Sequence, residues 1–365
     1  MKQKAVAKFL RFQSVNRKSK TCAQPFDFAR DKLRRSIEKL KWMVIVVLGV
    51  TLALCGAVAE AQPQAKIPKI GWLGSGSAPR QGGSPGGVWP MLRELGHVEG
   101  KNIAVEYRFA DNKLDRLPAL ADELIRLKVD VLVAVTTNDA LAAKKATRTI
   151  PIVFLNVSDP IAVGLIDSLA RPGGNITGIT NIAAELSGKR LELLKETVAN
   201  LSRVAVLWNP QDTASAQQWK ESQGSARELN LQLHSMEVGS ADKLDNAFKE
   251  AMKARSAALA VTHHQFARTY RKQIADLATK NRLPAIYGRG DYVDNGGLMS
   301  YGADEDERFK RAAVMIDKIL KGTKPADIPV ERPTKFEFMI NLKAAKEIGV
   351  TIPSNVLVRA QKVIK

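Results

Sequence analysis

Hydroxyl, amide and carboxylate side chains recur directly after short apolar runs in this sequence of 365 residues. If those runs are parallel strands, the residues that follow them meet at one edge of a sheet, where ligands bind in such folds. Groups of this kind hold a small polar molecule through hydrogen bonds and ion pairs. We expect the ligand-binding residues to be Ser75, Ser77, Thr136, Thr137, Asn138, Ser158, Asp159, Asn209, Thr262, His263 and Tyr287.

Asp159 is the only carboxylate expected at the site in the first half of the chain, so it is the natural partner of a ligand ammonium group. Capping a helix is the alternative role for Asp159. Asp followed by Pro160 is a typical helix start, and the helix would run to Leu169. Asn209 precedes Pro210 and allows the same alternative. A helix cap and a position in a ligand site are compatible.

Residues for other chemistries are missing. His263 and His264 are adjacent, so on a strand they point to opposite faces and do not readily chelate one metal ion. The turn 74–77 (GSGS) lacks the glycine patterns of nucleotide-binding loops. No G-x-S-x-G motif occurs, and Cys22 and Cys55 both lie among the first 61 residues, so the rest has no thiol. We expect no metal, no other cofactor and no enzymatic activity.

Apolar runs alternate with helical patterns from Lys69 onward. The expected strands are 70–73, 103–108, 131–135, 152–156, 204–208, 231–237, 257–261 and 285–287, and the expected helices include 114–127, 186–198, 214–229, 243–254 and 266–281. Alternating strands and helices, with nearly continuous apolar strands, predict parallel sheets covered on both faces. The pattern occurs twice, on either side of the turn-rich stretch 171–178 (RPGGNITG), which we interpret as a crossover. The predicted fold class is α/β, with two Rossmann-like lobes joined by a hinge.

The beginning of the chain has the pattern of an export signal. Residues 43–59 (MVIVVLGVTLALCGAVA) form an apolar block after Lys39 and Lys41, and Ala59-Glu60-Ala61 supplies the small residues that signal peptidase needs. We expect cleavage after Ala61 and a periplasmic location. A membrane anchor is the alternative, although the block is slightly shorter than the ~20 residues that span a bilayer.

Three further features bear on this leader. It is unusually long before its apolar block, which a start codon placed too far upstream would explain. Leu54 precedes Cys55 where a lipoprotein signal has a smaller residue, which argues against a lipid anchor. The leader also holds 13 Lys+Arg against 4 Asp+Glu, while residues 62–365 hold 43 against 33 without a run of five basic residues. Because the positive charge is not clustered, we expect no nucleic-acid partner.

Five ordered segments resemble a family of exported ABC transporter substrate-binding proteins whose known ligands include tryptophan and other aromatic amino acids. They are residues 94–103 (ELGHVEGKNI), 150–154 (IPIVF), 158–160 (SDP), 169–178 (LARPGGNITG) and 333–346 (PTKFEFMINLKAAK). The resemblance extends from about Ile67 to Ile364. It implies a type I periplasmic-binding fold, with a ligand enclosed between two lobes that three crossovers connect.

The resemblance also implies a domain division, and at one point the sequence departs from the family pattern. The expected parts are the leader 1–61, a first lobe of 66–178 plus about 298–328, and a second lobe of 179–297 plus about 329–365. Family members begin their first helix soon after the first loop. Here residues 80–91 (RQGGSPGGVWPM) hold four glycines and two prolines, which disfavour helix until about Met91. We expect this difference to alter the contacts from Ser75 to Gln81 and the ligand preference.

These features together predict a periplasmic solute-binding protein. It would capture a small polar molecule, an amino acid or a related compound, and deliver it as a monomer to an ABC permease in the inner membrane. A periplasmic sensor that reports its ligand to a membrane kinase or chemoreceptor is the alternative. A repressor of the LacI type uses a related core, but it would need a DNA-reading helix-turn-helix where this chain has its leader.

Overall fold

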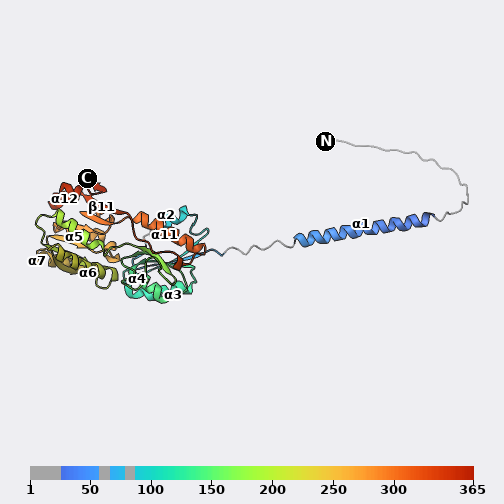
Figure 1. Ribbon diagram of the computed structural model, residues 1–365, viewed down its shortest axis with the longest axis horizontal. Helices are drawn as coiled ribbons and strands as arrows, with labels where there is room; N and C mark the ends of the chain where they lie inside the picture. Colours follow the sequence, from blue (N-terminus) through green and yellow to red (C-terminus); the bar gives the residue numbers. More distant parts are fainter. Residues whose placement is uncertain (1–25, 57–65, 79–86) are drawn as a thin grey trace, which may run out of the picture. The chain divides into compact units, whose positions relative to one another are not determined.

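The computed structural model describes residues 26–56, 66–78 and 87–365 (Figure 1). The chain divides into two compact units, Met1–Lys66 and Ile67–Lys365. The first unit contains the helix α1 (Phe26–Gly56), and the predicted cleavage site lies outside the described residues. No helix in the described ranges is both long enough and apolar enough to cross a membrane.

The first lobe is built on a five-stranded sheet. Its strands, in the order β2-β1-β3-β4-β5, all run parallel. They are β1 (Lys69–Gly74), β2 (Ala104–Phe109), β3 (Val131–Thr136), β4 (Ile152–Val157) and β5 (Ile176–Thr180). Strands β4 and β5 are buried along their whole length, as expected for a parallel sheet covered on both faces.

Four helices cover this sheet. They are α2 (Val88–Glu94), α3 (Leu117–Arg126, after the 3-10 turn Leu114–Arg116), α4 (Thr137–Ala146) and α11 (Glu305–Leu320). Successive strand residues point to opposite faces, so Leu132 and Phe154 pack under α3 and α4, while Val133 and Val153 pack under α2 and α11. Figure 1 shows the two helix pairs on opposite sides of the sheet.

The second lobe is built on a seven-stranded sheet in the order β12-β11-β10-β9-β8-β6-β7. Its strands are β6 (Arg203–Trp208), β7 (Gln232–Glu237), β8 (Ala258–Val261), β9 (Ala285–Tyr287), β10 (Met299–Ala303), β11 (Phe336–Asn341) and β12 (Lys362–Ile364). Only the β10–β11 pair is antiparallel among these neighbours.

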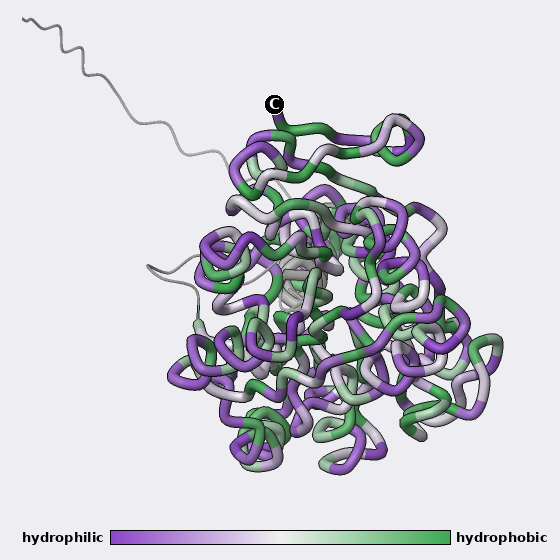
Figure 2. Tube along the Cα trace, turned by 90° about the vertical axis from the view of Figure 1, so that its left-hand side faces the viewer, coloured by the Kyte–Doolittle hydropathy of each residue, from purple (hydrophilic) through white to green (hydrophobic). Residues whose placement is uncertain are grey.

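Helices cover both faces of the second sheet as well. They are α5 (Leu186–Thr197), α6 (Thr213–Glu228), α7 (Leu244–Lys253, after the 3-10 turn Ala241–Lys243), α8 (Gln265–Thr269), α9 (Arg271–Lys280), α10 (Asp291–Asp294), α12 (Leu342–Ile348) and α13 (Ser354–Leu357). The apolar residues of α5 and α12 share one core, and those of α7 and α9 share the core on the other face. Figure 2 shows hydrophobic and hydrophilic residues alternating along the outer helices, which is typical of helices that bury one face.

The chain crosses between the lobes three times. It passes after β5, between β10 and α11, and after the 3-10 turn Pro325–Asp327. The third connection pairs with the end of β5, because Thr180 N donates to Glu331 O and Glu331 N donates to Gly178 O, both at 3.0 Å. The predicted α/β fold of two parallel-sheet lobes joined by a hinge is confirmed.

Several predicted boundaries differ from the structure. Residues 299–303 form β10 in the second sheet, whereas we expected the first lobe to resume at about 298; it resumes with α11, whose apolar face packs on the first sheet. Helix α2 begins at Val88 rather than near Met91, because Pro90 lies in its first turn, where a missing N–H costs no helical hydrogen bond. Residues 79–86 lie outside the described residues.

Two loop predictions were also wrong. The expected crossover 171–178 ends in strand β5, where Gly178 has φ of 154° and a Cβ there would lie 2.2 Å from Phe154 O on β4. The glycine therefore permits strand pairing rather than only a turn. The helix expected from Pro160 to Leu169 does not form, because Gly164 takes a φ of 67° and the segment folds into turns.

Candidate functional site

A cavity of about 620 Å³ lies between the two lobes. Its walls come from the carboxyl ends of β1, β2 and β3 in the first lobe and from α8 and the start of α9 in the second lobe. Parallel sheets place loops at this edge, so both lobes direct side chains into the same space. The lining residues are Trp72, Gly74, Ser75, Gly76, Ser77, Phe109, Val135, Gln265, Arg268, Thr269 and Arg271.

The first-lobe wall is aromatic. Trp72 lies on β1 and Phe109 ends β2, and both belong to a row of rings that continues through Trp89 and Tyr107. Neighbouring ring centroids in this row are 5.6, 5.8 and 6.1 Å apart, which is the range of favourable aromatic pairs. Because each ring supports the next, the cavity has a fixed apolar surface on this side.

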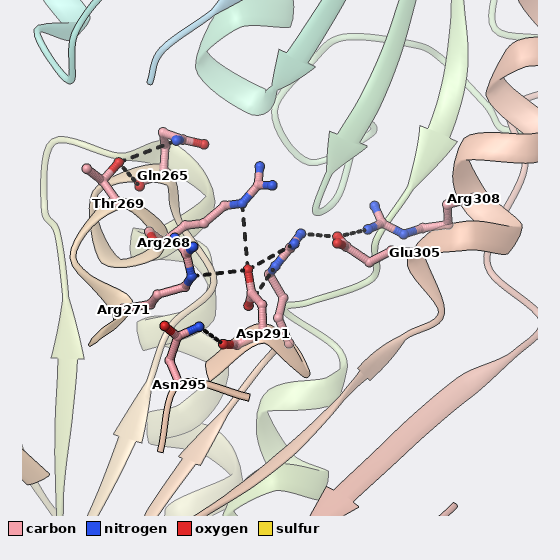
Figure 3. Close-up of polar contacts among 9 residues, drawn as sticks. Gln265, Arg268, Thr269, Arg271, Asp291, Asn295, Glu305 and Arg308 are labelled. Carbon is pink, nitrogen blue, oxygen red and sulfur yellow. Dashed lines mark hydrogen bonds and ion pairs between the residues drawn. The ribbon is translucent and has the colours of Figure 1, made fainter. Parts of the chain in front are cut away.

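The second-lobe wall is positively charged. Asp291 holds Arg268 and Arg271, with each Nε 3.9 Å from its Oδ2 (Figure 3). The terminal nitrogens of Arg268 point away from Asp291, as Figure 3 shows. Repulsion from Arg289, followed by burial, lowers the pKa of Arg268 to about 10, so it stays protonated at neutral pH.

A network of ion pairs extends from this wall toward the first lobe. Arg289, after β9, pairs with Asp291 at 3.2 Å and also with Glu305, the first residue of α11. Glu305 accepts a second hydrogen bond, of 2.7 Å, from Arg308, whose guanidinium also donates to Leu155 O at 3.3 Å. Glu305 therefore links a strand end of the second lobe to the helix that covers the first.

Three of the predicted first-lobe residues lie at the cavity or beside it. Ser75 and Ser77 line the cavity, and Ser75 Oγ is 3.2 Å from Thr136 Oγ1. Thr136 caps α4, where its side chain accepts from Asp139 N and its own N–H donates to Asp139 Oδ2 at 2.9 Å. Thr137 is buried, and its hydroxyl has no hydrogen-bond partner among the described residues.

Asn138 contacts the other lobe. Its Nδ2 donates to Asp212 Oδ2 at 3.2 Å, and its Oδ1 accepts from Thr213 Oγ1 at 2.8 Å. Asp212 is the N-cap of α6, and its burial raises its pKa to about 6. A second contact between the lobes is Thr269 Oγ1 donating to Asn112 Oδ1 at 3.4 Å. These bonds hold the lobes together around the cavity.

Ser158 and Asp159 line a different pocket, of about 330 Å³, together with residues of the hinge such as Thr180 and Arg332. Asp159 Oδ1 accepts hydrogen bonds from Ile161 N at 3.1 Å and Ala162 N at 3.0 Å, so its carboxylate caps a turn. Ser158 Oγ accepts from Ala184 N at 2.9 Å.

The four residues predicted in the second lobe are not among the described residues that line the cavity. Asn209 Oδ1 accepts from Gln211 N at 3.0 Å, and Thr262 Oγ1 donates to Leu207 O at 3.1 Å. Tyr287 is fully buried and stacks on Tyr292 at 4.4 Å, and burial raises its pKa above the usual range.

His263 has its pKa held well below the usual range, first by burial and then by Arg289 and other nearby arginines. It is therefore neutral at neutral pH. Over the described ranges, no group of three or more His, Cys, Asp and Glu side chains is arranged to hold a metal ion.

Sequence reasoning missed the residues that give the cavity its chemistry. Arg268 and Arg271 lie in the first turns of the helix predicted at 266–281, which the structure divides at Tyr270 into α8 and α9. Cations in a first helical turn oppose the helix dipole, and this unfavourable placement was the feature of the sequence that could have singled out the two arginines. Trp72 lies within a strand, where apolar character alone does not separate a core side chain from a lining one.

Residues 81–364 match the model of a family described as ABC transporter substrate binding protein. A tyrosine-binding protein of Clostridioides difficile is 26% identical over 264 residues, which are 72% of this chain and 76% of that protein.

Two solved structures are also similar. A conserved domain protein of Vibrio cholerae has a TM-score of 0.75 at 26% identity, covering 82% of this chain and all (100%) of that one. An ABC domain from Streptococcus pneumonia in complex with L-Trp has a TM-score of 0.73 at 25% identity, covering 81% of this chain and 99% of that one.

Proposed function

The chain belongs to the family of ABC transporter substrate-binding proteins, and we propose that it captures a small solute with an aromatic ring and a carboxylate for an ABC importer. An amino acid or a related compound has this chemistry. The predicted family and its type I periplasmic-binding fold are confirmed. The permease partner, the monomeric state and the choice of solute belong to the proposal.

The two walls of the cavity carry this proposal. Phe109, which is partly exposed, and Trp72, which is only 2% exposed, form an apolar wall on one side, and Arg268 and Arg271 offer guanidinium groups on the other. Guanidinium groups bind carboxylates with two parallel hydrogen bonds, and aromatic rings stack on one another. The volume of about 620 Å³ falls in the usual range for small-molecule sites. The relatives named for tyrosine and L-Trp support the same class of solute.

The two walls of the cavity belong to different lobes, and we expect the lobes to close around the solute for this reason. A solute that touches Phe109 of the first lobe and Arg268 of the second makes all its contacts only when the lobes are together. Its binding energy then stabilises the closed state, which the permease would recognise. No bond in the solute is made or broken in this mechanism.

Export is part of the proposal. Residues 1–61 would direct the chain to the periplasm and then be removed, so that the two-lobed unit acts alone. The division of the chain at Lys66 supports this, because the body forms a compact unit without the leader.

A solute at 100 times its Kd should stabilise the body by about 2.7 kcal/mol and reduce its radius of gyration. Mass spectrometry of the small molecule that co-purifies with the exported protein identifies the solute. Thermal unfolding and small-angle scattering, with and without that molecule, then measure the two effects. An unchanged radius of gyration under saturating, stabilising ligand would contradict hinge closure and indicate a rigid binding module.

A further inference from the structure

The cavity has two cations and no anion among its described lining residues. Arg268 and Arg271 are its charged members, and neither Asp nor Glu lines it. Residues 79–86, which follow the lining loop in sequence and are not described, contain no Asp or Glu either. An amino acid carries both a carboxylate and an ammonium group, so the walls provide an ion-pair partner for only one of the two.

The acids nearest this wall and its loops do not line the cavity. Asp291 accepts from Arg289 and lies 3.9 Å from both Arg268 and Arg271, so it neutralises part of their charge. Asp139 is fully buried, with Oδ2 bonded to Thr136 N and Oδ1 without a partner among the described residues, and burial raises its pKa to about 7. Asp111, beside the Gly76 loop, pairs with Arg116 at 2.9 Å.

The charge balance of the network is positive. Arg268, Arg271, Arg289 and Arg308 share two carboxylates, those of Asp291 and Glu305. A solute carboxylate entering this space offsets the excess charge. A solute ammonium group would instead lose its water, meet guanidinium groups of the same sign and find only neutral oxygens such as those of Ser75, Ser77 and Thr269.

We propose, building on the solute-binding function above, that the cavity recognises an aryl-alkyl carboxylate through its ring and its carboxylate, and that an α-ammonium group weakens binding. The ring lies against Trp72 and Phe109, and the carboxylate pairs with Arg268 and Arg271. This selectivity differs from that of an amino-acid site, which must also bind the ammonium group.

Matched ligands test the proposal directly. L-phenylalanine and 3-phenylpropanoate differ only in the ammonium group, as do L-tryptophan and indole-3-propanoate, and 2-phenylethylamine keeps the ammonium group without the carboxylate. Calorimetry at pH 7.5, on protein freed of its co-purified solute, should show each propanoate binding at least about tenfold more tightly than its amino acid, because the unpaired buried ammonium is costly. The amine should not bind.

A matched pair of variants assigns the carboxylate contact. Arg268→Gln should weaken binding of the propanoates by about tenfold or more. Arg227→Gln removes the same charge from an exposed position on α6 and should leave binding unchanged. Melting temperatures of both variants show whether the body remains folded.

Tighter binding of an amino acid than of its propanoate overturns the proposal, while the solute-binding function stands. Failure of all five compounds also overturns it. Closure around the co-purified solute in scattering would then show that the protein binds a different class of solute. If the co-purified solute neither stabilised the body nor closed it, that result would count against the solute-binding function itself.

Discussion

The carboxylate of Asp159 accepts two backbone hydrogen bonds, from Ile161 and Ala162, and lies in the smaller pocket near the hinge. An amide oxygen accepts the same two bonds, so Asp159→Asn should leave the free energy of unfolding and the solute affinity nearly unchanged. Asp159→Ala removes the acceptor and should cost about 1 kcal/mol of stability without changing affinity. Denaturant unfolding and calorimetry on the three proteins measure both quantities.

A loss of 2–5 kcal/mol in affinity for Asp159→Asn, roughly the cost of unpairing a buried charge, would contradict this expectation. It would show that Asp159 pairs with a ligand cation.

Single residues of the site could be predicted only where a loop directly follows a strand. Ser75 and Ser77, which were predicted in this way, line the cavity because the carboxyl end of β1 leads into it. Asn209 and Thr262 also follow strands, yet their side chains satisfy backbone groups of their own lobe. Whether a polar side chain faces a ligand or a neighbouring backbone depends on tertiary packing, which spacing in sequence does not determine.

At the level of elements, the first turn of α4 meets the N-terminus of α6 across the two lobes through Asn138. Asn138→Ala removes the bonds to Asp212 and Thr213 and so destabilises the closed state relative to the open one. Solute affinity should fall by roughly five- to thirtyfold, since each hydrogen bond contributes about 1 kcal/mol. Calorimetry measures the affinity, and scattering should show a larger radius of gyration without ligand.

Asn281→Ala provides the matched control for this link. Asn281 donates to Leu277 O at 2.8 Å within the second lobe, so its loss does not involve the other lobe. Affinity should remain at the level of the unmodified protein. An equal loss of affinity in both variants would show that asparagine removal acts through general stability rather than through closure.

Elements with a strong periodic pattern were predicted well, whereas those that depend on distant partners were not. The apolar runs of β1, β3 and β4 are buried on both faces, and this burial produces a visible pattern in sequence. Strand β5 follows turn residues and contains Gly178, so its pairing with β4 became evident only in three dimensions. Strand β10 joins the second sheet because the chain returns beside β9 and β11, a relation that no local pattern encodes.

At the scale of the whole molecule, the chain divides into two compact units, Met1–Lys66 and the body Ile67–Lys365. The surplus of positive charge in the first 61 residues, 13 basic against 4 acidic, lies in the first unit. The described residues that line the cavity lie between Trp72 and Arg271, within the body. Folding and solute binding should therefore be properties of the body alone.

A protein of residues 62–365 should have the melting temperature and solute affinity of the body in the full chain, because the described body buries its own cores without the leader. N-terminal sequencing of exported protein should give Gln62, since Ala59-Glu60-Ala61 fits the cleavage rule. A mature form that begins at Cys55 and carries lipid would contradict this site and make the protein a lipoprotein. A lower melting temperature for the shortened protein would instead show that the leader stabilises the body. If Gln62 is the first residue, and the melting temperature and solute affinity are both retained, the first 61 residues serve only to direct export of the chain.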